Sequence, residues 1–171
     1  CNSGFTTYLA GYKGDVKAVD ENTGKTIVVV EGRDEPWSNR GERQLQLAEN
    51  YQKPLQKQFW QAYVQHLKDR GWLEHCHYEV LDENGGTEAY YKTHRTLHRI
   101  VPDLCLMSYQ STPLTHPGVV GVNGLWAPLL ESLDYSIDAM RERQKKGDKA
   151  WFYICNQRAS STKEHMPSIF M

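Results

Sequence analysis

The stretch from His75 to Gln110, HCHYEVLDENGGTEAYYKTHRTLHRIVPDLCLMSYQ, decides the fold of this chain. It begins with His75–Asp82 and ends with Asp103–Gln110, two strand-length runs rich in Tyr, Val and Leu. Between these runs, aromatic and apolar residues recur at helical spacing, Thr87 is a good helix cap, and Pro102 stops a helix. A strand, a helix and a second strand in this order predict a βα unit of a parallel sheet.

The rest of the chain repeats this alternation. Val119–Val122 and Lys149–Asn156 are further strand-length runs, and helices are predicted at Pro54–Arg70 and from Leu130. Because right-handed crossovers join consecutive βα units, we expect four parallel strands, adjacent in chain order, in an α/β fold. A complete (β/α)₈ TIM-type barrel needs at least about 200 residues. We therefore expect part of such a barrel, with its other strands outside the chain; a small open sheet is the alternative.

The N-terminal part of the chain differs in character. Asp15–Asp20 and Thr26–Glu31 flank a turn that contains Asn and Gly, which predicts a β-hairpin. Residues 32–50 are polar and rich in turn-forming residues, so we expect a long surface loop. We assign residues 1–53 to a hairpin and loop insertion of the barrel, and residues 54–171 to its βα units, as a single and incomplete domain.

The composition excludes two classes of protein. The chain has 20 Lys and Arg against 21 Asp and Glu, a formal charge of −1, which argues against a nucleic-acid-binding protein. No apolar run approaches the roughly 20 residues that a membrane span needs. The cysteines lack the paired spacing of zinc ligands, so we expect no metal site, and no cofactor is indicated. We expect three of them to be buried free thiols: Cys76, Cys105 and Cys155.

Two adjacent carboxylates, Asp82 and Glu83, end the first predicted parallel strand. The active sites of α/β folds lie at the carboxyl ends of the strands. Successive strand residues face opposite ways, so the two groups meet different environments and their pKa values can separate. One can then stay ionised while the other serves as a general acid. The alternative is that both acids merely favour the start of the following helix.

Aromatic and amide residues lie at or just after the other predicted strand ends. Aromatic rings cover the apolar faces of sugars and amides pair with hydroxyl groups, so this combination is typical of a sugar site. The candidates for sugar binding are Tyr109, Asn123, Trp126, Tyr153 and Asn156. Trp126 as a core residue and Tyr153 as a buried sheet residue are the alternatives.

Several motifs in order resemble the catalytic region of glycoside hydrolase family 123. These are Asp20–Lys25, Leu67–Trp72 with its Gly-Trp, Leu81-Asp82-Glu83, Leu125–Pro128 and Trp151–Cys155. The resemblance covers about residue 8 to the end of the chain. One departure follows the acidic pair, where Asn84-Gly85-Gly86 stands in place of a nearby Arg or Pro in many relatives.

The resemblance implies a (β/α)₈ barrel and a retaining exo-β-N-acetylgalactosaminidase whose nucleophile is the acetamido group of the substrate. Glu83 would then be the general acid/base, and Asp82 would orient the acetamido group. The partner implied is a glycan that contains N-acetylhexosamine, the protein would be secreted or on the cell surface, and further domains can accompany the barrel. The alternative is a non-catalytic carbohydrate-binding or scaffold barrel.

Overall fold

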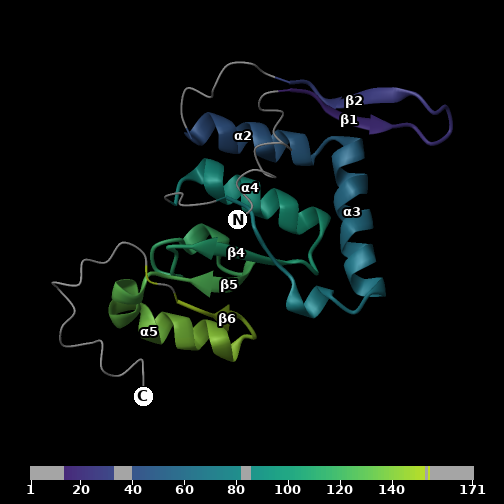
Figure 1. The fold of residues 1–171 in the computed structure, drawn as a ribbon. Coiled ribbons are helices and arrows are strands. Elements are labelled where there is room, and N and C mark those ends of the chain that lie inside the picture. The colour runs from purple at the N-terminus through teal and green to yellow at the C-terminus, as the bar shows by residue number, and fades with distance from the viewer. Residues whose placement is uncertain (1–13, 33–39, 82–85, 153, 155–171) are drawn as a thin grey trace.

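A parallel sheet of four strands organises the computed structural model, which describes residues 14–32, 40–81, 86–152 and 154 (Figure 1). The strands are β3 (His77–Glu79), β4 (Cys105–Tyr109), β5 (Asn123–Ala127) and β6 (Lys149–Ala150). They lie in chain order, and each neighbouring pair is parallel. The prediction of an α/β fold with four parallel strands in this order is therefore confirmed. Closure into a barrel stays a prediction, because the described strands form an open sheet with β3 and β6 at its edges.

Three predicted strands need correction. The first is shorter than His75–Asp82, because β3 spans only His77–Glu79 and His75 ends the 3₁₀ helix η1 (Leu73–His75). The third strand is not Val119–Val122: it begins at Asn123, which pairs with Leu106 of β4, and Pro117–Val119 form the short 3₁₀ helix η2. Val119 is buried in the core although it lies in η2 and not in a strand. An apolar residue at this position therefore does not require that the sheet extends here. The fourth strand is shorter than Lys149–Asn156, because β6 pairs only with Leu125 and Trp126 before β5 ends.

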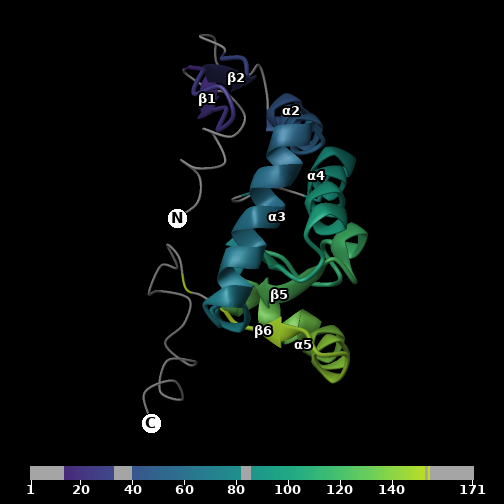
Figure 2. The ribbon, with the colours of Figure 1, turned by 90° about the vertical axis from the view of Figure 1, so that its right-hand side faces the viewer.

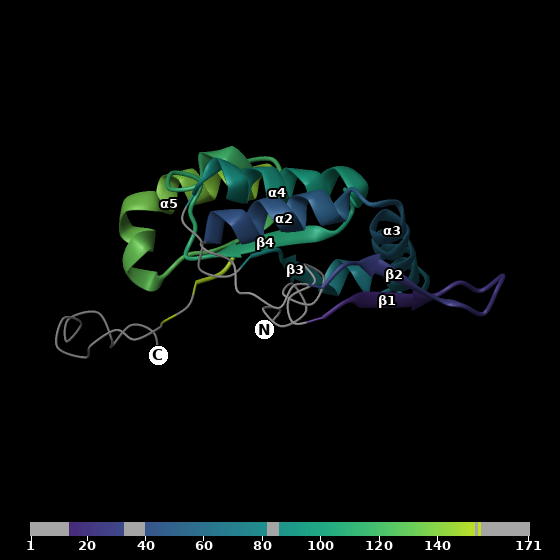
Figure 3. The same cartoon turned by 90° about the horizontal axis from the view of Figure 1, so that it is seen from above.

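Helices α3 (Pro54–Asp69), α4 (Glu88–Ile100) and α5 (Leu130–Lys145) lie where the sequence predicts them. Pro54 occupies the first turn of α3, where its missing N–H has no helical partner to lose. Thr87 caps α4, because its hydroxyl accepts a hydrogen bond from the backbone N–H of Tyr90 at 3.2 Å. Figure 3 shows α4 and α5 together with α2 on one side of the strands, as expected for consecutive βα units.

Helix α2 (Arg40–Tyr51) corrects the prediction of a loop over residues 32–50. One face of α2 is fully buried, with Leu47, Ala48 and Tyr51 each 0% exposed. The helix packs against α4, and Thr93 of α4 donates a hydrogen bond to the backbone carbonyl of Gln44 at 2.8 Å. Its stability therefore comes from a partner helix whose hydrogen-bonding residue is 49 positions away, which local turn-forming residues do not reveal.

The predicted hairpin is confirmed, with β1 (Val16–Val19) antiparallel to β2 (Thr26–Val30). Figure 2 shows it at one end of the molecule, with α2, α3 and α4 between it and β5 and β6. The division of the chain at residue 53 stays a prediction. Within the described ranges, no helix has the length and apolar character needed to cross a membrane.

Side chains alternate between the two faces of the sheet, and each face has its own apolar cluster. The larger cluster lies on the helix side and includes Leu106 and Trp126 with residues of α2, α3 and α4. The smaller cluster consists of Met107, Leu125 and Ala127, with Cys105 and Tyr109 packed against it. Tyr109 therefore lies on the face opposite the helices, which in a barrel is the inner face.

Side chains from the two edge strands meet on one side of the sheet. Lys149 of β6 donates from Nζ to the backbone carbonyl of Glu74, in the 3₁₀ helix η1 (Leu73–His75) before β3, at 3.0 Å. The ring of Trp151, just after β6, lies edge-on to His77 of β3 with centroids 4.7 Å apart. These contacts reach across β4 and β5, so the sheet curves toward this face, which is consistent with part of a barrel.

Two of the three cysteines predicted to be buried thiols lie in the described part of the chain. Cys76 and Cys105 are free, as predicted, but both are half-buried rather than buried. Cys155 lies outside the described residues.

Candidate active site

The carboxyl ends of the four parallel strands lie along the same side of the sheet, at Glu79, Tyr109, Ala127 and Ala150. This side is called the carboxyl edge of the sheet, as distinct from its outer strands β3 and β6. Loops that leave this edge converge in α/β folds, which makes it the candidate active site. The predicted catalytic residues Asp82 and Glu83 follow Glu79 by three and four positions. Both lie outside the described residues.

Described residues before and after this acidic pair contact the core or another helix. Val80 and Leu81 are buried in the larger apolar cluster. On the other side, Thr87 caps α4 and also donates from its hydroxyl to Oε1 of Gln44 at 3.1 Å. The described neighbours of the acidic pair are thus anchored between β3 and α4.

Tyr109 and Gln110 stand at the carboxyl end of β4. Tyr109 is half-buried on the face opposite the helices, where it packs against the smaller cluster. Gln110 is exposed and has a left-handed backbone, with φ of 55°, while its N–H donates to the carbonyl of Ala127 at 3.0 Å. Non-glycine residues rarely adopt this conformation, and such strain gathers at functional sites. Its position after an apolar strand was the only signal in the sequence.

Asn123 lies at the first position of β5, so the prediction that it follows a strand end is wrong. The error follows from the misplaced third strand. The side chain of Asn123 is buried: Nδ2 donates to Oγ of Ser108 at 2.6 Å, and Oδ1 lies 3.0 Å from Nδ1 of His94. The hydroxyl of Tyr90 also bonds to Oγ of Ser108. Asn123 therefore joins β5 to β4 and α4 and has no surface to offer a sugar.

This buried network, formed by Tyr90, His94, Ser108 and Asn123, is uncharged at neutral pH. Burial lowers the pKa of His94 to about 3, although the hydrogen bond to Asn123 opposes the shift. Burial also raises the pKa of the Tyr90 hydroxyl. Because the amide nitrogen of Asn123 donates to Ser108, its oxygen accepts from Nδ1–H of His94, which fixes the tautomer. Nε2 of His94 has no hydrogen-bond partner among the described residues.

Trp126 lies on the helix side of β5 and is fully buried. Its Nε1–H donates to Oδ2 of Asp148 at 2.7 Å, and the same carboxylate receives two hydrogen bonds from Arg143, at 2.7 and 2.9 Å. The tryptophan therefore joins β5 to the end of α5. This is the core position considered as the alternative for Trp126, and it leaves the ring no surface for a sugar.

Two more predicted sugar-binding residues, Tyr153 and Asn156, lie outside the described residues. The structure instead describes Trp151 and Phe152 at the carboxyl end of β6, 47% and 48% exposed. The sequence reasoning placed both inside a longer strand and did not select them. Their aromatic character immediately after a short strand would have been the signal. Trp151 thus joins Tyr109 as an aromatic residue at this edge of the sheet.

The described side chains around this site do not form a set of metal ligands. Within the described ranges, no three His, Cys, Asp or Glu side chains gather closely enough to hold a metal ion. His94 is a case in point, because its Nδ1 is engaged by Asn123 and its neighbours in the network are uncharged.

Comparison with known proteins gives a family. Residues 34–168, more than three quarters of the chain, match the family model described as glycoside hydrolase 123, catalytic domain. No curated protein matches the chain. The matched region contains all four parallel strands and the segment with Asp82 and Glu83. The chain therefore belongs to glycoside hydrolase family 123.

Proposed function

We propose that this protein is a retaining glycosidase that removes terminal β-N-acetylhexosamine, most specifically β-N-acetylgalactosamine, by substrate-assisted catalysis. Family membership indicates glycoside hydrolysis in general. The narrower proposal is supported above all by one observation: Asp82 and Glu83 are adjacent in the sequence and follow Glu79, the last residue of β3, by three and four positions, in the connection from a parallel strand to helix α4.

In this mechanism Glu83 is the general acid/base. It protonates the glycosidic oxygen as the bond between that oxygen and the anomeric carbon breaks. The carbonyl oxygen of the substrate's acetamido group forms the new bond to the anomeric carbon, which gives an oxazoline-like intermediate. Water then attacks the anomeric carbon as its bond to the acetamido oxygen breaks, and gives a proton to Glu83. The two successive inversions retain the configuration. No protein nucleophile is needed, which makes this an exception to the two-carboxylate scheme.

Asp82 has a different role. Its carboxylate accepts a hydrogen bond from the acetamido N–H, which holds the group in position for attack. Its negative charge also stabilises the positive charge that develops on the oxazolinium ring in the transition state. Adjacent carboxylates suffice because the nucleophile arrives with the sugar.

Aromatic residues around this pair would shape the sugar subsite. Tyr109 is a proposed contact, since it lies at a strand end on the face of the sheet opposite the helices, which would be the inner face of a barrel. Tyr153 and Asn156 remain proposed contacts. Gln110 and Trp151, both accessible at the same edge, are added to them.

Two variants of the full-length protein test the catalytic roles. Glu83→Gln should abolish hydrolysis of disaccharides, whose leaving groups need protonation, and spare aryl glycosides with good leaving groups. Asp82→Asn should slow both kinds of substrate, because it acts on formation of the intermediate. The measurement is kcat/KM for aryl and disaccharide β-N-acetylgalactosaminides, with the β-N-acetylglucosaminides alongside.

Asp138→Asn on α5 is the matched control, because this carboxylate is 92% exposed and far along the chain from the acidic pair. It should leave turnover unchanged. Normal turnover by Asp82→Asn would rule out the substrate-assisted mechanism. If the wild-type protein binds hexosaminides but hydrolyses none, the non-catalytic carbohydrate-binding alternative is correct.

A further inference from the structure

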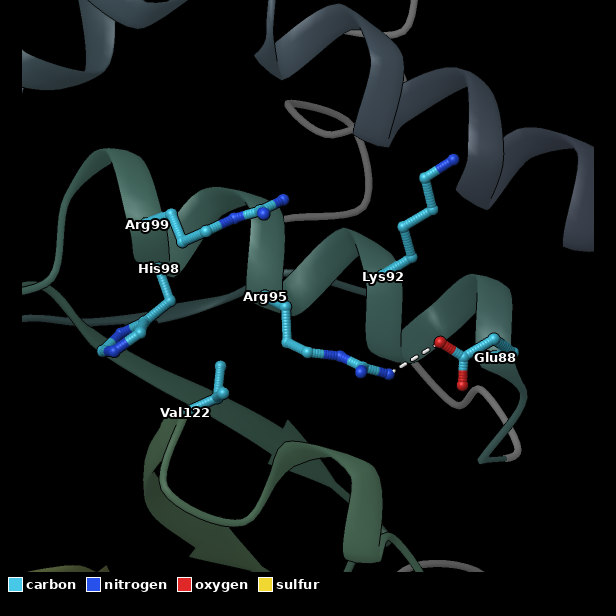
Figure 4. A pocket seen from close by; sticks show the side chains of 6 residues that line it. All are labelled: Glu88, Lys92, Arg95, His98, Arg99 and Val122. Carbon is cyan, nitrogen blue, oxygen red and sulfur yellow. Dashed lines mark hydrogen bonds and ion pairs between the residues drawn. The ribbon is translucent and has the colours of Figure 1, made fainter.

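A groove of about 350 Å³ lies along α4, beside the turn that leads into β5. Figure 4 shows that its side chains come almost entirely from one flank of the helix. The residues that line it are Glu88, Lys92, Arg95, His98, Arg99 and Val122. Cationic side chains thus outnumber carboxylates in the groove, although the chain as a whole has a formal charge of −1.

The groove exists because β4 and β5 are joined without an α-helix. The connection contains only η2, which packs very closely on Tyr91 of α4: a Cβ atom added at Gly118 would lie 2.2 Å from Cδ2 of Tyr91. Short η2 covers the helix at this point and leaves the following turns of the same flank open. A full helix in this connection would cover the flank.

The charges in the groove are arranged along the helix. Arg95 is held in place, because Nη2 donates to Oε1 of Glu88 at 2.8 Å and Nε donates to the carbonyl of Tyr91 at 3.2 Å. Lys92 and Arg99 are exposed and have no carboxylate partner in the described part of the chain. The helix dipole accounts for a cation in the last turn, such as Arg99, but not for Lys92 in the middle of α4.

We infer that this groove binds a glycan chain that carries sulfate or carboxylate groups, as a second carbohydrate-binding surface on the helix side of the sheet. Lys92 and Arg99 are seven residues apart, which is about 10 Å along a helix, so a chain with two or more anionic groups can contact both side chains at once. Arginine forms bidentate hydrogen bonds with planar or tetrahedral oxyanions, and lysine supplies a point charge. The assignment to a glycan rests on the proposed function.

Binding measurements on the full-length protein test this inference. The probe is a sulfated tetrasaccharide that contains N-acetylhexosamine, and its desulfated form is the matched ligand control. The double variant Lys92→Gln/Arg99→Gln should weaken binding of the sulfated probe about fivefold to tenfold by calorimetric titration at low salt. High salt should weaken wild-type binding because the groove is open to solvent. The control variant Lys57→Gln/Lys146→Gln removes the same charge from exposed sites elsewhere and should bind as the wild type does.

Three outcomes would overturn the inference. These are equal affinity for the sulfated and desulfated probes, unchanged affinity in the Lys92→Gln/Arg99→Gln variant, and equal or tighter binding of an RNA oligonucleotide of the same charge. Hydrolysis of a neutral aryl N-acetylhexosaminide separates the two proposals, because that substrate makes no use of the groove. Turnover without groove binding contradicts only the groove, whereas groove binding without turnover contradicts only the proposed activity.

Discussion

At Asn123, one amide side chain serves two buried partners from different elements, Ser108 on β4 and His94 on α4. Its amide nitrogen donates one hydrogen bond and its amide oxygen accepts the other, so a side chain of similar size without an amide cannot make both hydrogen bonds. Removing one partner from a buried hydrogen bond costs more than the bond contributes, because the remaining groups stay desolvated.

The variant Asn123→Ala should therefore lower the free energy of unfolding by about 2–4 kcal/mol. Urea unfolding followed by circular dichroism measures this. Asn22→Ala in the exposed hairpin turn is the control and should change stability by less than about 0.5 kcal/mol. A loss at Asn123 no greater than in the control would mean that the network contributes nothing to stability.

His94 makes stability depend on pH. Its pKa is lowered to about 3 in the folded protein, by burial first, while an unfolded histidine titrates near 6.5. The unfolded state therefore binds more protons between these values, and stability falls as pH falls through this window. From pH 7 to pH 5 the contribution of His94 should fall by about 2 kcal/mol. Unfolding curves measure the loss of stability between the two pH values for the wild type and for His94→Gln, and the loss in the wild type should be larger by that amount. An equal loss in both proteins would show that His94 does not titrate this way.

At the level of single residues, the sequence predicts some positions in the fold but not the burial of side chains such as Asn123. Tyr109 could be placed at a strand end from the sequence alone. The burial of Asn123 and Trp126 could not, because it depends on the register of β5 against β4, which shifts between Leu106 and Met107. A one-residue change of register moves a side chain to the other face of a sheet.

Among the elements, η2 and α4 approach each other very closely. At Gly118 a Cβ atom would lie within 2.5 Å of three ring atoms of Tyr91. Gly118→Ala should force η2 away from α4 and lower the free energy of unfolding by about 1–3 kcal/mol. In a Tyr91→Leu background, which makes room for the methyl group, the same substitution should cost much less. Chemical denaturation of the four proteins gives the coupling, and independent effects would contradict the contact.

Elements with local signals could be predicted, and those with distant partners could not. The bounds of α3 and α4 follow from Pro54, Thr87 and Pro102, which act within one helical turn. Helix α2 is held by burial against α4, and β5 by pairing with β4, so neither carries its evidence within its own residues. Because the pairing of β5 with β4 cannot be read from the sequence, the apolar run at Val119–Val122 predicts a strand there, whereas the strand begins at Asn123.

At the scale of the molecule, the curvature of the sheet brings β6 to β3. Burial lowers the pKa of His77 on β3, and the positive charge of Lys149 on β6 lowers it further. Lys149→Gln should therefore raise the pKa of His77 toward its ordinary value, which an NMR titration of the histidine ring measures. Lys146→Gln, at the end of α5, should leave this pKa unchanged. An unchanged pKa of His77 in Lys149→Gln would mean that strands β3 and β6 do not approach each other in solution.

The buried amide of Asn123 also bears on how the protein ages. Asn123 is followed by Gly124, the dipeptide that deamidates most readily, because the glycine nitrogen can attack the side-chain carbonyl to form a cyclic imide. In the folded protein that carbonyl is held by His94 and the backbone is extended in β5, so the ring cannot close. Deamidation at Asn123 must then proceed from opened or unfolded chains, and hydrolysis of the imide leaves an aspartate or isoaspartate whose charge does not fit a neutral core. The rate of this reaction at Asn123 therefore follows how often the fold opens, not the intrinsic lability of the dipeptide.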